Sequence, residues 1–256
     1  MTFDTAAALL AATLAGAGLL AGSFLGLVSL RLPAGDPIVA GRSRCGGCGR
    51  PLPPWRLIPL LSYLFSRGRC AACGTAIPLR YPLMESACAA IGVWAALSQP
   101  SAVAAVITAL LGWQLLLIAV VDAEHFWLPD PLTLPLLVTG VAAAAMLDRL
   151  PLPDAVAGAA AGFGGLWLLA RGYRRVRGRE GLGGGDPFLL AAGGAWVGWI
   201  GLPSVLLWAA LSGLSVIAAR ILTGRAVSGA DRLPFGVFLA VGVWLTWLLG
   251  PLGLAR

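Results

Sequence analysis

The sequence predicts an all-α, polytopic integral membrane protein with about eight transmembrane helices and a small cytoplasmic loop that is zinc-ribbon-like in its cysteine spacing. The chain of 256 residues is 59% hydrophobic and only 11% charged. Its mean hydropathy is +0.87. These values lie far outside those of ordinary soluble domains, so a water-soluble globular fold is excluded.

Eight apolar stretches are long enough to be interpreted as membrane spans of roughly 15 to 25 residues. They cover residues 5–30, 81–98, 101–121, 132–147, 152–170, 187–200, 202–220 and 234–249. The fourth, sixth and eighth are short, and only Gly201-Leu202-Pro203 separates the sixth from the seventh. Seven or nine spans therefore remain open. The first stretch has no basic region before it and exceeds the length of a signal-peptide core, so we expect a retained helix.

The distribution of arginine predicts the orientation of these spans. All 18 basic residues are arginine, and only Arg149 and Arg256 fall outside three segments: 31–80, 171–179 and 220–232. With eight spans, these three segments lie on one side of the membrane, and an excess of basic residues marks the cytoplasmic side. We therefore expect both termini on the opposite side. The net charge of +7 then reflects topology and contact with the lipid bilayer rather than binding of nucleic acid.

Two aspartates, Asp122 and Asp186, follow or precede apolar stretches in a chain that has few carboxylates. The predicted topology brings both to the cytoplasmic edge of the membrane. An ionisable group at membrane depth is costly and is by default a candidate functional residue. The helix dipole disfavours a charged Asp122 at a helix C-terminus and favours a charged Asp186 at a helix N-terminus. Such a pair can activate a water on a peptide carbonyl and protonate the leaving amine.

The neighbouring residues indicate which aspartates have a functional role and which cap a helix. Asp130 precedes Pro131, a common helix start, and we interpret it as a cap. Asp186 precedes Pro187 in the same way, so a capping role is a real alternative there. The glycines before it, Gly183, Gly184 and Gly185, exceed what a cap requires. They would permit a substrate strand to approach the backbone closely, which favours the functional interpretation.

A second constellation consists of two CxxC pairs. Cys45 and Cys48 are followed, after 21 residues, by Cys70 and Cys73, and a glycine follows each pair. Two disulfides or four free thiols are the alternatives, but a reducing cytoplasmic face argues against disulfides. Four thiolates select Zn2+ over harder ions and leave no open coordination position, so we expect a structural zinc. The fifth cysteine, Cys88, is read as a small buried apolar residue.

Taken in order along the chain, these motifs resemble those of the bacterial prepilin peptidases, the type IV leader peptidases and N-methyltransferases. The resemblance covers nearly the whole length. The matching pieces are Gly22-Ser23-Phe24-Leu25, Arg31-Leu32-Pro33, both CxxC pairs with Ile58-Pro59-Leu60-Leu61-Ser62 between them, Arg80-Tyr81-Pro82-Leu83-Met84-Glu85, residues 122–130, Gly181-Leu182-Gly183-Gly184-Gly185-Asp186 and Pro234-Phe235-Gly236. Two positions differ from the family pattern. Gly26 replaces the usual asparagine, and Phe188 stands where a lysine usually follows the second aspartate.

The resemblance implies an aspartic endopeptidase of the bacterial cytoplasmic (inner) membrane, with Asp122 and Asp186 as catalytic residues facing the cytoplasm. It would cleave the basic leader of type IV prepilins, or of pseudopilins of type II secretion, after a glycine. It would then methylate the new N-terminus with S-adenosylmethionine. Residues 1–98, with the four-cysteine loop at 31–80, are associated by resemblance with methylation. Residues 99–256 form the six-helix peptidase domain.

Three further residues are candidates for substrate binding or methylation: Glu85, Gly22 and Ser23. Glu85 opens the second span and is either a helix-start carboxylate or a pocket residue facing the basic leader. Two other function classes are kept as alternatives. One is a transporter whose carboxylates relay protons, although no repeat of the kind transporters show is visible. The other is a non-catalytic relative that binds pilins. The sequence does not specify which pilus or secretion system is served, or the oligomeric state.

Overall fold

The computed structural model describes residues 5–39, 42–178, 181–224 and 233–252. These residues form two compact units, 1–113 and 114–256, and each is described by itself. The predicted all-α class is confirmed, because the described residues hold helices and no strand, with only two isolated bridges in the cysteine loop. Four arginines used in the charge argument lie outside the described residues: Arg179, Arg225, Arg232 and Arg256.

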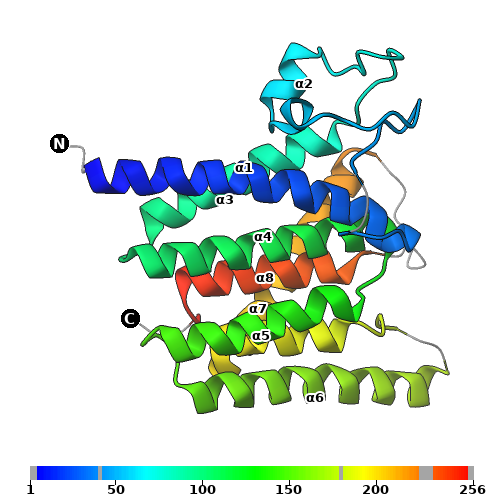
Figure 1. Ribbon diagram of the computed structural model, residues 1–256. Coiled ribbons are helices and arrows are strands. Elements are labelled where there is room, and N and C mark those ends of the chain that lie inside the picture. Colours follow the sequence, from blue (N-terminus) through cyan, green and yellow to red (C-terminus); the bar gives the residue numbers. More distant parts are fainter. Residues whose placement is uncertain (1–4, 40–41, 179–180, 225–232, 253–256) are drawn as a thin grey trace. The chain divides into compact units, whose positions relative to one another are not determined.

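The first unit is built on two helices, α1 (Thr5–Ala34) and α3 (Arg80–Ser98), which pack side by side (Figure 1). Small residues allow the close approach. A Cβ placed on Gly22 of α1 would lie 2.6 Å from the Cα of Glu85, and one on Gly18 would lie 2.8 Å from the Cα of Ala89. Glycines four residues apart on one helix face are a common way for apolar helices to pack without large side chains.

Between α1 and α3 the chain forms a loop with a 3-10 turn, η1 (Pro54–Leu57), and a short helix, α2 (Leu61–Phe65). Glu85 on α3 fastens this loop. Its Oε2 accepts a hydrogen bond of 2.8 Å from the backbone N–H of Leu60, a residue with a φ of 57°. Arg80, at the start of α3, donates a hydrogen bond of 3.0 Å to the buried Ser29 of α1. Side chains of α3 therefore fix the loop and the end of α1.

The second unit contains the end of α4 (Ala102–His125), then α5 (Asp130–Met146), α6 (Leu152–Arg177), α7 (Asp186–Leu222) and α8 (Phe235–Leu249). Helix α7 packs against α5, α6 and α8. Trp196 of α7 joins these helices, because its Nε1 donates to the Leu136 carbonyl of α5 and its ring meets that of Trp247 edge to face. The Arg149 guanidinium lies 4.1 Å above the centroid of the Trp247 ring. The first half of α7 is thus held in the unit's interior.

Among the described residues, α1, α4, α6 and α7 are long and apolar enough to cross a membrane, and α5 and α8 are shorter apolar helices. The predicted count of about eight spans is not confirmed. The sixth and seventh predicted stretches both fall within α7, which contains a non-helical residue, Gly198, with a φ of 71°. The break therefore lies three residues before the expected Gly201-Leu202-Pro203 segment. A positive φ is accessible to glycine without steric cost, and this explains the position of the break.

Candidate functional site

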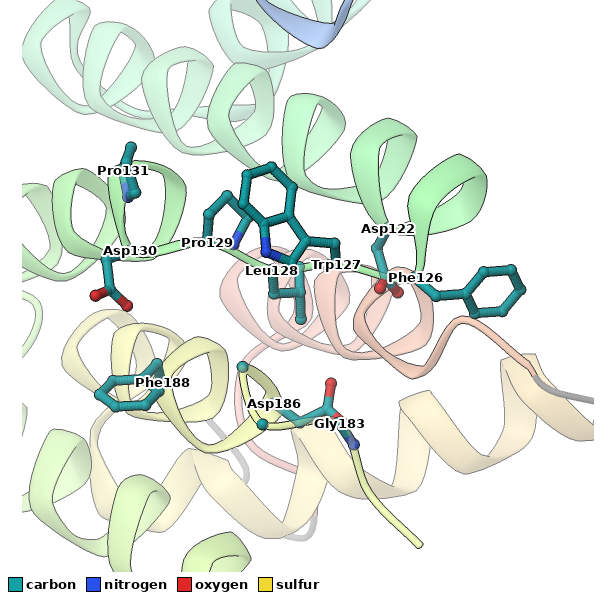
Figure 2. Close-up of a pocket in the computed structure, with 12 residues that line it drawn as sticks. Asp122, Phe126, Trp127, Leu128, Pro129, Asp130, Pro131, Gly183, Asp186 and Phe188 are labelled. Atoms are coloured by element: carbon teal, nitrogen blue, oxygen red, sulfur yellow. The ribbon is translucent and has the colours of Figure 1, made fainter. Parts of the chain in front are cut away.

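Both candidate aspartates line one cavity of about 550 Å³ in the second unit. Its wall is formed by the last turn of α4, by the connection from Phe126 to Pro129, by the first residues of α5, and by the glycine run that leads into α7. Figure 2 shows the carboxylates of Asp122 and Asp186 directed into the same space. Two residues that lie 64 positions apart in the sequence, 186 minus 122, are therefore brought to one site.

Asp122 lies in the last turn of α4 and is 4% exposed. Its Oδ2 accepts a hydrogen bond of 3.1 Å from the backbone N–H of Val237, at the start of α8. The residue before Val237 is Gly236, and a Cβ placed there would lie 2.8 Å from Asp122 Oδ2. The start of α8 therefore holds the Asp122 carboxylate through a hydrogen bond. It can approach the carboxylate this closely because residue 236 is a glycine, which has no side chain.

Asp186 begins α7 and is also 4% exposed. Its Oδ2 accepts a hydrogen bond of 2.9 Å from the backbone N–H of Gly183, so the glycine loop folds back onto the carboxylate it precedes. Gly185 has a different role. A Cβ on Gly185 would lie 2.6 Å from the Leu128 carbonyl oxygen, whereas a Cβ on Gly184 would meet nothing within 4 Å. The close approach at Gly185 is therefore made by the chain's own Leu128.

Asp130 has a different environment from the one expected for a helix cap. Helix α5 begins at Asp130, but the N-cap position is Pro129, and the cap makes no side-chain hydrogen bond. The Asp130 side chain is exposed and lines the cavity. Phe126 also lines the cavity, is 51% exposed and has a φ of 52°, an uncommon conformation for a bulky residue.

A substitution at Gly236 tests whether the position of the Asp122 carboxylate matters. We expect Gly236→Ala to reduce activity at this site by roughly tenfold to a hundredfold, because the new methyl group must displace either Asp122 or the start of α8, and small displacements of catalytic groups cost about this much. The matched control is Gly164→Ala on α6, a position that does not line the cavity and where a Cβ would meet nothing within 4 Å, so the turnover rate should stay near that of the unchanged protein. Equal rates for the two variants would contradict the role given to Gly236.

The four predicted cysteine ligands come together in the first unit. The Sγ atoms of Cys45, Cys48, Cys70 and Cys73 all lie within 4.8 Å of one another, and all four cysteines are free thiols. The two pairs fold alike. Backbone N–H groups of Gly49 and Gly74 donate to the carbonyls of Cys45 and Cys70, and both glycines have positive φ values, 68° and 74°. The glycine after each pair therefore completes a tight turn around the thiols.

This geometry fits a tetrahedral thiolate site. Zn–S bonds of about 2.3 Å place tetrahedral sulfur atoms about 3.8 Å apart, and the Sγ atoms of Cys45 and Cys73 are separated by 3.7 Å. Hydrogen bonds from the Thr75 side chain and backbone lower the pKa of Cys73 to about 6. Backbone N–H groups of Cys48 and Gly47 also lower the pKa of Cys45. The surroundings therefore favour the thiolate, the form that binds a metal ion, at Cys45 and Cys73, whereas the pKa of Cys48 is raised to about 11 by its neighbouring thiols and by burial.

The other candidate residues lie in the first unit. Glu85 is 5% exposed and holds the backbone of Leu60, so it acts within the protein as an anchor for the loop. Gly22 is buried against α3, while Ser23, beside it on α1, is half-buried. Gly26 also packs on α3, where a Cβ would lie 3.3 Å from the Tyr81 ring.

Sequence reasoning did not assign a site role to Gly236, Val237 or Phe126. The signal for the first two was present, because Pro234-Phe235-Gly236 was among the matched motifs, but no residue pattern shows that it meets Asp122. Phe126 has no comparable signal, since its backbone conformation cannot be read from the local sequence.

Comparison with protein families gives two matches in succession. Residues 17–99 match the model described as the bacterial peptidase A24 N-terminal domain, and residues 109–218 match the type IV leader peptidase family. Asp122 and Asp186 both lie in the second match.

Curated relatives align over most of the chain. A Pseudomonas putida protein named prepilin leader peptidase/N-methyltransferase is 37% identical over 91% of this chain and 88% of its own length. Proteins of the same name from Burkholderia pseudomallei and Aeromonas salmonicida are 42% and 39% identical, over 86% and 83% of this chain and 71% and 73% of their own lengths. No solved structure matches the chain.

Proposed function

The chain belongs to the type IV leader peptidase family, and from this we propose that it is a membrane aspartic endopeptidase that cleaves the basic leader of type IV prepilins or pseudopilins after a glycine. The observation that carries the proposal is the meeting of two buried carboxylates, Asp122 and Asp186, from different helices in one cavity. The name that the curated relatives share, prepilin leader peptidase/N-methyltransferase, supports the same activity.

The geometry supports a mechanism in which the two carboxylates share the proton transfers. One ionised carboxylate takes a proton from a water as the water oxygen attacks the carbonyl carbon of the scissile peptide. The other, protonated, donates its proton to the leaving nitrogen as the C–N bond breaks. Each carboxylate has its Oδ2 held by a backbone N–H, from Val237 or Gly183. These bonds fix both side chains in orientations that face the cavity, so little reorganisation is needed during the reaction.

Two alternatives receive less support. A proton-relay transporter would place its carboxylates near the midplane between repeats, whereas Asp122 and Asp186 lie at an end of α4 and at the start of α7. A non-catalytic, pilin-binding relative would be favoured by a closed space between the two aspartates, and the cavity of about 550 Å³ argues against that.

We assign N-methylation of the new N-terminus to residues 1–98, which lie within the first unit, and cleavage to residues 99–256. S-adenosylmethionine would supply the methyl group for this step. A second cavity, of about 210 Å³, lies beside the cysteine site and is lined by Arg50, Trp55 and Arg56. Guanidinium groups can pair with a carboxylate and an exposed indole offers a face for a purine ring, but this cavity is smaller than the whole molecule, so the assignment rests on the N-methyltransferase name of the relatives.

Zinc at Cys45, Cys48, Cys70 and Cys73 would have a structural role, because four thiolates leave no position for substrate. The loop at 31–80 carries eight arginines at 31, 42, 44, 50, 56, 67, 69 and 80. This charge supports its placement on the cytoplasmic side of the bacterial inner membrane, where the active site would meet the leader before export. The partners are therefore the prepilin substrate and the bilayer.

The proposal is tested by incubating the purified protein, reconstituted in lipid, with a synthetic substrate that has a basic leader ending in glycine and an apolar helix beginning with phenylalanine. Intact-mass measurement should show loss of the leader. With S-adenosylmethionine present, the shortened product should then gain the mass of one methyl group. Leader loss without this gain would leave a peptidase only. An unchanged substrate would overturn the proposed function.

A further inference from the structure

The cavity that holds the two aspartates is strongly acidic. The residues that line it include three carboxylates, Asp122, Asp130 and Asp186, and no arginine or histidine. Asp122 and Asp186 are each 4% exposed and accept hydrogen bonds from backbone N–H groups. Asp130, by contrast, is exposed. The three carboxylates therefore do not have equivalent tasks, and Asp130 is the one whose charge can meet a ligand.

Asp130 makes the two sides of the cavity chemically different. Figure 2 places Asp130 on one side of the two candidate catalytic carboxylates and the exposed Phe126 ring on the other. Asp130 is the first residue of α5 and is followed by Pro131, whose ring fixes the local backbone. The carboxylate is thus carried on a rigid helix start rather than on a mobile loop. A peptide bound across the aspartate pair would have one side facing an anion and the other facing an aromatic ring.

We propose that Asp130 selects substrates with a lysine or arginine close to the scissile bond, by pairing with that cationic side chain inside the cavity. The proposal rests on the peptidase function assigned to the same site, and it names a specificity residue rather than a further catalytic one. A charge-assisted hydrogen bond between a carboxylate and an ammonium or guanidinium group is among the stronger polar contacts in proteins. Among the described residues, those that line the cavity include no cation, so the cationic partner that we assign to Asp130 is a side chain of the substrate.

A structural role for Asp130 makes different predictions. A carboxylate in the first turn of a helix is stabilised by the helix dipole, and Asp130 occupies that position in α5. Asp154, the third residue of α6, is also a carboxylate in a first helical turn, but it does not line the cavity. If only the helix start matters, Asp130→Asn and Asp154→Asn should behave alike. Neither change should then depend on the charge of the substrate.

The experiment uses three synthetic substrates that differ at one position only, that of the leader's basic residue nearest the scissile glycine. This position holds lysine, glutamine or glutamate. The unchanged protein should cleave them in that order of kcat/KM. Asp130→Asn should lose about tenfold in kcat/KM on the lysine substrate, mostly through KM, as expected for one hydrogen bond to a charged group. On the glutamine substrate it should match the unchanged protein. Asp130→Arg should prefer the glutamate substrate, and Asp154→Asn should preserve the original order.

The proposal is overturned if Asp130→Asn slows all three substrates by the same factor, or leaves the order of preference unchanged. Should Asp130→Arg fail to fold, the comparison of Asp130→Asn with Asp154→Asn on the same three substrates still decides the matter. Cleavage of every substrate by the unchanged protein, without any dependence on charge, would reject the role of Asp130 while leaving the peptidase function intact. No cleavage of any substrate would instead reject the peptidase function.

Discussion

Asp122→Asn and Asp186→Asn are each expected to lower the rate of leader removal by at least about a thousandfold, because each replaces a group that must carry a proton during hydrolysis. Asparagine preserves the shape of the side chain and can still accept the hydrogen bond from Val237 or Gly183. The loss would therefore come from proton transfer rather than from packing. Cleavage is measured by intact mass on the same synthetic substrate for all variants.

The matched control is Asp154→Asn, which removes a helix-start carboxylate that does not line the cavity. It should cleave at the rate of the unchanged protein. Metal content should be equal in all three variants, since the cysteine site belongs to the other unit. A rate near that of the unchanged protein for Asp122→Asn or for Asp186→Asn would show that the site is misassigned.

Cys45→Ser and Cys73→Ser are expected to abolish stoichiometric zinc binding, because a serine hydroxyl is a poor substitute for a thiolate in a tetrahedral site. Loss of the metal should also destabilise the folded state of the loop at 31–80. In small sites of this kind, the free energy of metal binding contributes directly to folding. The loop should then become sensitive to limited proteolysis. Methylation should fall more than cleavage, because both candidate catalytic aspartates lie in the second unit.

Cys88→Ala serves as the control for this experiment. Cys88 is fully buried on α3 and lies outside the four-cysteine group, so its removal should leave the zinc content unchanged. Freshly prepared, reduced protein without zinc would contradict the metal assignment. Equal losses of methylation and cleavage in Cys45→Ser would contradict the division of the two activities between the units.

The helices and the identity of the candidate site could be predicted from sequence because the signals are local and strong. Long apolar stretches predict helices, and the ends of α3 and α5 fall close to the expected limits, whereas α6 begins at Leu152 as expected but continues to Arg177, past the predicted end at residue 170. The two aspartates stand out because carboxylates are rare in this chain and costly beside apolar segments. The CxxC spacing likewise predicts a cluster, and the structure brings the four thiols together.

What could not be predicted depends on contacts between distant segments. The break in α7 lies at Gly198 because that glycine adopts a positive φ, whereas the local sequence offers Gly201 and Pro203 as equally good breakers. The Asp130 carboxylate looks like a cap in any local window, and only the arrangement around the cavity shows that it faces a ligand space. The need for Gly236 is visible only when Asp122 lies opposite it.

In the first unit, the contact made by Glu85 likewise could not be predicted from the sequence. A carboxylate six positions into α3, at residue 85 of a helix that begins at residue 80, could have been a helix-start charge or a pocket residue. In the structure it accepts a hydrogen bond from the backbone N–H of Leu60, a residue with a positive φ. Burial of a carboxylate is tolerated when it is hydrogen-bonded, and a sequence pattern does not reveal such a partner 25 residues away.

The central claim is that Asp122 and Asp186 act as one catalytic unit on a single peptide bond, and a double-mutant cycle tests it most directly. The rate constant for leader removal is measured for the unchanged protein, for Asp122→Asn, for Asp186→Asn and for the double variant. Groups that act together in one step show strongly non-additive losses. The double variant should therefore be no slower than the slower single variant. Losses that multiply in the double variant, or a single variant that keeps its activity, would contradict the claim.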